Sequence, residues 1–104
     1  MPKHVVLIHG GAGKWREDRL TLAKKSLLSI ANEVSKILKE KNSIDIVEFA
    51  IRCMELDEVF NAGRGAALNL LGEVELDAGI MTSEGKIGAV ATVRNVMHPI
   101  SLAK

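Results

Sequence analysis

The sequence predicts an α/β fold made of one strand, two helices and then a run of antiparallel strands. Residues 4–8 are a short β-branched run that ends in glycines, which is typical of a buried strand leading into a loop. Helical periodicity follows as far as residue 56, and strand patterns separated by turn signals follow after it. We interpret residues 1–104 as one segment of a single domain, because no repeat, low-complexity tract or linker interrupts them.

Two amphipathic helices are predicted in the first half of the chain. The first covers residues 16–41, where apolar side chains form one stripe and most charged side chains fall outside it. Asn42 ends this helix, because asparagine tolerates the left-handed conformation found at helix C-termini. Ser43 is then expected to be the N-cap of a second helix that runs to about Leu56. Residues 55–65 form a loop, since polar residues and glycines break both periodicities.

Three strands are predicted after the loop, at residues 66–70, 74–81 and 87–93. The turns at 71–72 and 82–85 are short, so we expect consecutive antiparallel pairing, with residues 4–8 in the same sheet. The second half of the segment 74–81 is apolar on both faces, and we expect it to be buried on both faces.

A final helix is predicted to begin at Pro99, which suits the first helical turn. Only a few residues separate this proline from Lys104, and so short a helix is marginal alone. We therefore expect the polypeptide to continue beyond these 104 residues.

Charge and composition argue against several function classes. Lys and Arg number 14 against 13 for Asp and Glu, so a formal charge of +1 gives no electrostatic argument for nucleic acid or for an anionic membrane. Cys53 is the single cysteine, which excludes an internal disulfide and suits a reducing compartment. No leader pattern and no stretch of about 20 apolar residues is present. We expect a soluble, cytoplasmic protein.

The two glycine-rich loops allow plain structural interpretations as well as functional ones. Gly10 is followed five residues later by Trp15, and Arg16 stands where a dinucleotide fingerprint needs glycine, so both standard phosphate patterns fail. A tight turn without a ligand is favoured over nucleotide binding at this loop. The segment 60–65 places Asn61 between a helix and a strand, where functional residues concentrate, although from the residues alone an asparagine turn is the more common explanation.

Five sequence blocks resemble the isoaspartyl peptidase/plant-type asparaginase family, in that family's order and spacing. They read Ile-His-Gly-Gly-Ala-Gly at 8–13, Phe-Asn-Ala-Gly-Arg-Gly at 60–65, Glu-Leu-Asp-Ala-Gly-Ile-Met at 75–81, Gly-Ala-Val-Ala at 88–91 and His-Pro-Ile-Ser-Leu-Ala at 98–103. Each block alone is weak, but together they cover essentially the whole chain. Two alternatives stay open: a glycosylasparaginase-like amidase, against which the single cysteine counts, and a non-enzymatic scaffold or binding module.

The resemblance implies a fold and an activity. The family fold is a four-layer αββα sandwich of the N-terminal-nucleophile (Ntn) hydrolases. Its precursor cleaves itself into two subunits, and the new N-terminal threonine of the second is both nucleophile and general base. Such enzymes hydrolyse the side-chain amide of L-asparagine and β-aspartyl (isoaspartyl) dipeptides. The family's Gly-Thr-Val-Gly block is absent from these 104 residues. The resemblance therefore implies the N-terminal part of the α subunit, inactive alone, with the β subunit as partner in an (αβ)2 assembly.

Two sites are carried over residue by residue from the resemblance. Asn61 is similar to the asparagine that faces the catalytic threonine, and Gly10 is similar to the glycine whose backbone lies beside the scissile bond. The loop 54–64 is similar to a sodium-binding loop, and no other cofactor is implied. Its ligands would be backbone carbonyls, those of Met54, Glu55, Asp57, Phe60, Ala62 and Arg64.

Overall fold

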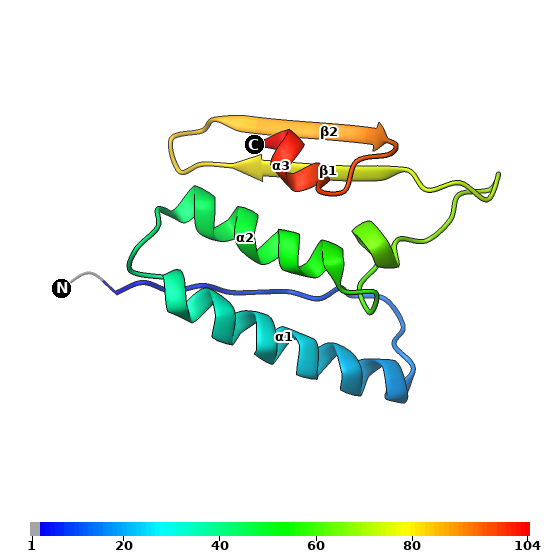
Figure 1. Ribbon diagram of the computed structural model, residues 1–104, viewed down its shortest axis with the longest axis horizontal. Coiled ribbons are helices and arrows are strands. Elements are labelled where there is room, and N and C mark those ends of the chain that lie inside the picture. Colours follow the sequence, from blue (N-terminus) through cyan, green and yellow to red (C-terminus); the bar gives the residue numbers. More distant parts are fainter. Residues whose placement is uncertain (1–2) are drawn as a thin grey trace.

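The computed structural model describes residues 3–104 and has the predicted order of elements, but with fewer strands (Figure 1). The elements are the helices α1 (Glu17–Ile37) and α2 (Ser43–Leu56), the 3-10 turn η1 (Gly63–Gly65), the strands β1 (Leu76–Met81) and β2 (Ile87–Val93), and the helix α3 (Pro99–Ala103). α1 packs against α2, and α3 contacts α2 and both strands. The short helix α3 therefore links the helical pair to the sheet.

The hydrophobic core lies between α1 and α2. Its buried members come from the inner stripes of the two helices and from the loop after α2: Ala23, Ile30, Val34, Ile46, Ala50, Met54 and Phe60. Burying a side chain the size of isoleucine or phenylalanine contributes about 1.5–3 kcal/mol each. Because Phe60 belongs to this core, the start of the loop that carries Asn61 is held by packing.

The predicted helices are confirmed, with corrected ends. α1 stops at Ile37, four residues early, because the Ile37 carbonyl accepts hydrogen bonds from the N–H groups of both Glu40 (3.0 Å) and Lys41 (3.1 Å), which closes a turn. The N-cap of α2 is Asn42 and not Ser43: the Asn42 side chain accepts a hydrogen bond from the Asp45 N–H at 3.0 Å. Asparagine and serine are comparable caps, so sequence alone does not separate two adjacent candidates.

The predicted strand at residues 4–8 is wrong as a strand. The segment runs alongside α1 and α2 in an extended conformation (Figure 1), and the burial of its side chains alternates as in a strand. Val6 and Ile8 pack on the core, whereas Val5 is 83% exposed and Leu7 94% exposed. Within the described residues no backbone hydrogen bond joins this run to another segment. The β pattern is present, but the neighbour that would complete a ladder is not.

The predicted strand at residues 66–70 is also wrong, because Asn69 forms a local turn instead. The Asn69 side-chain oxygen accepts hydrogen bonds from the N–H groups of Leu71 (3.0 Å) and Glu73 (2.9 Å). Its own N–H donates to the Glu73 carbonyl at 2.8 Å. Such side-chain bonds to nearby backbone compete with a sheet ladder, and here they prevail.

The hairpin of β1 and β2 is confirmed as antiparallel, and its turn is closed by the Thr82 N–H donating to the Lys86 carbonyl at 2.9 Å. The expectation of burial on both faces is wrong, because Met81 is 67% exposed and Asp77 and Gly79 are exposed beside it. In the described part of the chain, α3 covers the other face of this hairpin.

A β-bulge opposite Asp77 was not predicted. The register shifts between Leu76 and Ala78, and Thr92 there adopts a positive φ of 51°. Positive φ is costly for a β-branched residue. The Asp77 carboxylate accepts a hydrogen bond from the Thr92 N–H at 2.8 Å, which stabilises this conformation. Asp77 therefore has a structural role in the hairpin.

The predicted helix at Pro99 is confirmed, and three polar contacts fasten it to α2. Arg52 donates to the Ser101 hydroxyl at 2.7 Å. Lys104 forms ion pairs with Asp45 and Glu48. Hydrogen bonds from Ser101 and Lys104 lower the pKa of Glu48, and those to Asp45 and Glu48 raise the pKa of Lys104.

The third contact is the buried carboxylate of Glu55, whose residue is 2% exposed. Oε2 of Glu55 accepts a hydrogen bond from the Ile100 N–H at 3.2 Å, at the start of α3. Oε1 lies 3.1 Å from Nδ1 of His98. We assign the imidazole proton of His98 to Nδ1, so that Nδ1 donates to the Glu55 oxygen. Glu55 thereby joins the end of α2 to the start of α3.

We expect Glu55→Ala to lower the free energy of unfolding of the complete protein by about 3 kcal/mol, because it leaves buried donors on His98 and Ile100 without an acceptor. Glu58→Ala is the matched control, since that side chain is exposed three residues away. Urea denaturation of both variants measures the difference. Equal stability of the two variants would contradict the linking role of Glu55.

Candidate functional site

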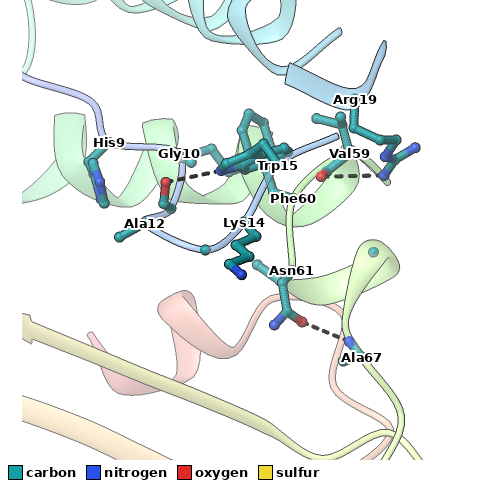
Figure 2. Close-up of a pocket in the computed structure, with 15 residues that line it drawn as sticks. His9, Gly10, Ala12, Lys14, Trp15, Arg19, Val59, Phe60, Asn61 and Ala67 are labelled. Carbon is teal, nitrogen blue, oxygen red and sulfur yellow. Dashed lines mark hydrogen bonds between the residues drawn. The ribbon is translucent and has the colours of Figure 1, made fainter. Parts of the chain in front are cut away.

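A cavity of about 660 Å³ lies between the glycine loop and the loop that follows α2 (Figure 2). One wall is residues 9–15, and the other is made of residues of the segment 59–67. Arg19 of α1 and Met54 of α2 complete the lining. The two sequence segments that resemblance singled out, 50 residues apart, therefore face the same cavity.

Gly10 touches the core at the edge of this cavity. A Cβ atom at position 10 would lie 3.0 Å from Cε1 of Phe60 and 3.2 Å from Cδ1 of Leu27. Phe60 is buried and cannot easily move away. Glycine at this position thus allows the loop backbone to approach the phenylalanine that precedes Asn61.

Asn61 lies at the cavity with its two amide atoms in different roles. Its Oδ1 accepts a hydrogen bond from the Ala67 N–H at 2.7 Å (Figure 2). Because a backbone N–H only donates, the amide atom of Asn61 that faces Ala67 must be the oxygen. The NH2 group of Asn61 takes no part in this hydrogen bond. The asparagine turn is therefore present, and it also leaves an amide donor available at the cavity.

Two further side chains fix the cavity walls, and the sequence had not indicated either. Trp15 donates from Nε1 to the Gly11 carbonyl at 3.2 Å, which folds the glycine loop back on itself. Arg19 donates from Nη2 to the carbonyls of Glu58 (3.2 Å) and Val59 (3.4 Å). Arg19 thus holds α1 against the opposite loop, through a contact between residues about 40 positions apart that no local pattern predicts.

The loop 54–64 is the segment to which the resemblance assigns backbone ligands for sodium. Within residues 3–104 no group of three or more His, Cys, Asp or Glu side chains is arranged to hold a metal ion. The loop is tightly curled, since the Ala62 N–H donates to the Phe60 carbonyl at 2.9 Å and the Gly65 N–H to the Ala62 carbonyl at 3.0 Å. A carbonyl oxygen has two lone pairs, so such bonds leave room for a second partner.

Two glycines lie in close contact with backbone oxygens of this loop. A Cβ atom at Gly63, whose φ is +51°, would overlap the carbonyl oxygen of Glu55. A Cβ atom at Gly65 would overlap the carbonyl oxygens of Phe60 and Glu58. Each glycine therefore lets two backbone segments of the loop approach more closely than a side chain would allow. The Glu58 carbonyl also lies against Gly65, although the resemblance does not place it among the sodium ligands.

We expect Gly65→Ala to destabilise the complete protein by about 1–3 kcal/mol, because the added methyl group meets backbone oxygens that cannot rotate away. Gly13→Ala is the control, since nothing lies within 4 Å of the corresponding Cβ position. Melting temperatures of the two variants test this. A Gly65→Ala protein that melts no earlier than Gly13→Ala would show that the loop is not closely packed at this glycine.

These features describe an α/β protein with a candidate site for a small polar molecule between two loops. The chain belongs to the asparaginase family: the family model described as asparaginase matches residues 2–104. The resemblance noted in the sequence is thereby confirmed. Membership implies the Ntn-hydrolase fold, with which the helices and antiparallel strands seen here are compatible.

Individual relatives are similar over nearly the whole chain. A probable isoaspartyl peptidase/L-asparaginase of Drosophila melanogaster is 40% identical over 111 residues, covering 100% of this chain and 33% of the relative. The isoaspartyl peptidase/L-asparaginase of Mus musculus is 41% identical over 103 residues, covering 96% of this chain and 32% of the relative. A plant-type L-asparaginase of Pyrococcus abyssi is 39% identical over 101 residues, covering 95% and 33%. The chain spans about a third of the length of the curated relatives it matches.

Among the described residues, no helix combines the length and the apolar character needed to cross a bilayer.

Proposed function

We propose that the chain is the N-terminal part of an amidohydrolase that cleaves L-asparagine and β-aspartyl dipeptides after self-cleavage. The observation that carries the proposal is the shared cavity: Gly10 and Asn61, assigned separately by resemblance, both line it. The names of the relatives, isoaspartyl peptidase/L-asparaginase, support the choice of substrates. The threonine nucleophile would come from the part of the protein that follows these residues.

In this mechanism the chain supplies positioning groups. The Asn61 NH2 group donates a hydrogen bond toward the threonine or toward an attacking water, and its Oδ1 stays on Ala67. The Gly10 backbone lies beside the scissile bond, and the absence of a side chain there keeps the approach open. Holding such groups in place before reaction avoids reorganisation during it.

Sodium would be held by the carbonyls of the loop 54–64 and would add rigidity, with no part in bond making. The predicted ligands are those of Met54, Glu55, Asp57, Phe60, Ala62 and Arg64. The tight curl of this loop, which needs glycine at 63 and 65, keeps the carbonyls of Glu55 and Phe60 close to Asn61 and so supports this assignment. Since Asn61 lies within the same loop, a bound ion would restrict where its amide points.

The remaining part of the fold is proposed to cover the open face of the hairpin. Large apolar side chains are exposed along and beside it: Leu68, Leu70, Leu71, Met81, Ile87 and Met97. Exposed apolar surface of this kind marks an interface. We expect a second sheet from the β subunit to cover that surface, in an αββα sandwich and an (αβ)2 assembly. The single cysteine favours a cytoplasmic setting for this assembly.

The test is an assay of the complete, matured protein with L-asparagine and with β-aspartyl-leucine. We expect release of aspartate from both substrates. A protein that matures but hydrolyses neither substrate would favour the non-enzymatic scaffold or binding module. Hydrolysis confined to glycosylated asparagine would favour the glycosylasparaginase-like alternative.

A further inference from the structure

The cavity is positively charged, and its lining contains one cation without a partner. Among the described residues that line it, there is no Asp or Glu, and the cations are Lys14 and Arg19. Arg19 is occupied by the carbonyls of Glu58 and Val59. Lys14 forms no ion pair within residues 3–104. An ammonium group with no protein counter-charge, in a cavity of this size, suits an anionic ligand group.

The position of Lys14 places this charge at the candidate reaction site. Lys14 lies on the glycine loop, four residues after Gly10, and Figure 2 shows its side chain extending towards Asn61. Lys14 is exposed, whereas Phe60 at the inner side of the cavity is 2% exposed. If the aspartyl half of a substrate occupies the inner side, next to Phe60, the Lys14 ammonium group on the exposed side would face the leaving group.

The two proposed substrates differ in charge at the leaving group. Both contain the same aspartyl half, which must fit inside the site in either case. L-Asparagine releases ammonia, which has no carboxylate, whereas a β-aspartyl dipeptide releases an amino acid that carries one. A cation on the leaving-group side therefore distinguishes the two, and a cation on the aspartyl half does not.

We propose that Lys14 is a specificity-determining residue that favours β-aspartyl dipeptides over L-asparagine by binding the carboxylate of the leaving amino acid. This inference rests on the proposed function and adds to it a residue that sets the choice between its two substrates. The contact is a charge-assisted hydrogen bond, Nζ donating to a carboxylate oxygen. Such a bond is worth roughly tenfold in kcat/KM when it is made to the substrate.

The experiment uses the complete, matured protein and three probes: L-asparagine, β-aspartyl-leucine and β-aspartyl-leucine amide, which lacks the terminal carboxylate. We expect Lys14→Gln to lower kcat/KM for the dipeptide roughly tenfold, mainly by raising KM. For L-asparagine, kcat/KM of the variant should stay within about twofold of the parent value. The parent should prefer the dipeptide over its amide by about the same factor, and Lys14→Gln should lose that preference. Lys14→Arg should retain it.

Lys25→Gln is the matched control, because Lys25 is exposed on α1, outside this cavity, and it should resemble the parent with all three probes. An equal loss with L-asparagine and dipeptide, or no loss with the dipeptide, would overturn the role of Lys14 and leave the proposed function standing. A parent protein that hydrolyses none of the probes would instead overturn the proposed function and, with it, this inference.

Discussion

The 104-residue polypeptide, purified alone, is expected to show no measurable hydrolysis of L-asparagine or β-aspartyl-leucine. The proposed reaction needs a threonine with a free amine, and the Gly-Thr-Val-Gly block is absent from these residues. Removing the nucleophile of a hydrolase costs on the order of 10⁶ in kcat. The groups that this chain does contribute, Gly10 and Asn61, only position other groups.

The comparison must be made with the complete protein at the same concentration, and with a circular dichroism spectrum that shows the isolated polypeptide to be folded. Turnover by the isolated polypeptide within a hundredfold of the complete protein would contradict the assignment of the nucleophile to another part. It would also require a catalytic group among the residues described here.

Asn61→Asp in the complete protein is expected to lower both self-cleavage and kcat by roughly a hundredfold, with little change in melting temperature. The aspartate carboxylate still offers an oxygen to the Ala67 N–H, so the turn is preserved. Its second oxygen takes the place of the NH2 group, so the hydrogen-bond donor at the cavity is lost. Asn61→Ala removes both the acceptor for Ala67 and the NH2 donor. We expect it to lose the same activity and also to lower the free energy of unfolding by roughly 0.5–1.5 kcal/mol, the contribution of one hydrogen bond.

The pair of variants separates the two roles of this residue. If Asn61→Asp matures and turns over like the parent while Asn61→Ala melts earlier, Asn61 is only a turn residue and its placement opposite the threonine is wrong. Rates of precursor disappearance on a gel, kcat for L-asparagine and melting temperature are the three measurements. They should be made on the same preparations.

The helices and the hairpin were predictable because their signals are local. The stripe that contains Ile30 and Val34, the proline at 99 and the glycine turn near residue 85 each specify a conformation within a few neighbouring positions. The two wrong strands show the limit of such signals. Residues 4–8 have the burial alternation of a strand, but a strand also needs a neighbour, which local sequence does not provide.

The site was predictable only as far as the resemblance reached. Gly10 and Asn61 were singled out because they fall in recognisable blocks, and the cavity brings both together. The link from Glu55 to His98, the link from Arg19 to the loop at residue 58, and the charge contributed by Lys14 arise from tertiary contacts. Periodicity and spacing contain no information about contacts of this kind.

The central claim is tested most directly by following the complete precursor over time, with intact mass, N-terminal sequencing and aspartate release measured on the same samples. We expect one polypeptide to become two, the second beginning with threonine, and hydrolysis of L-asparagine to rise in proportion to the cleaved fraction. A precursor that hydrolyses L-asparagine fully before any cleavage, or one that never cleaves and never hydrolyses it, would contradict the account.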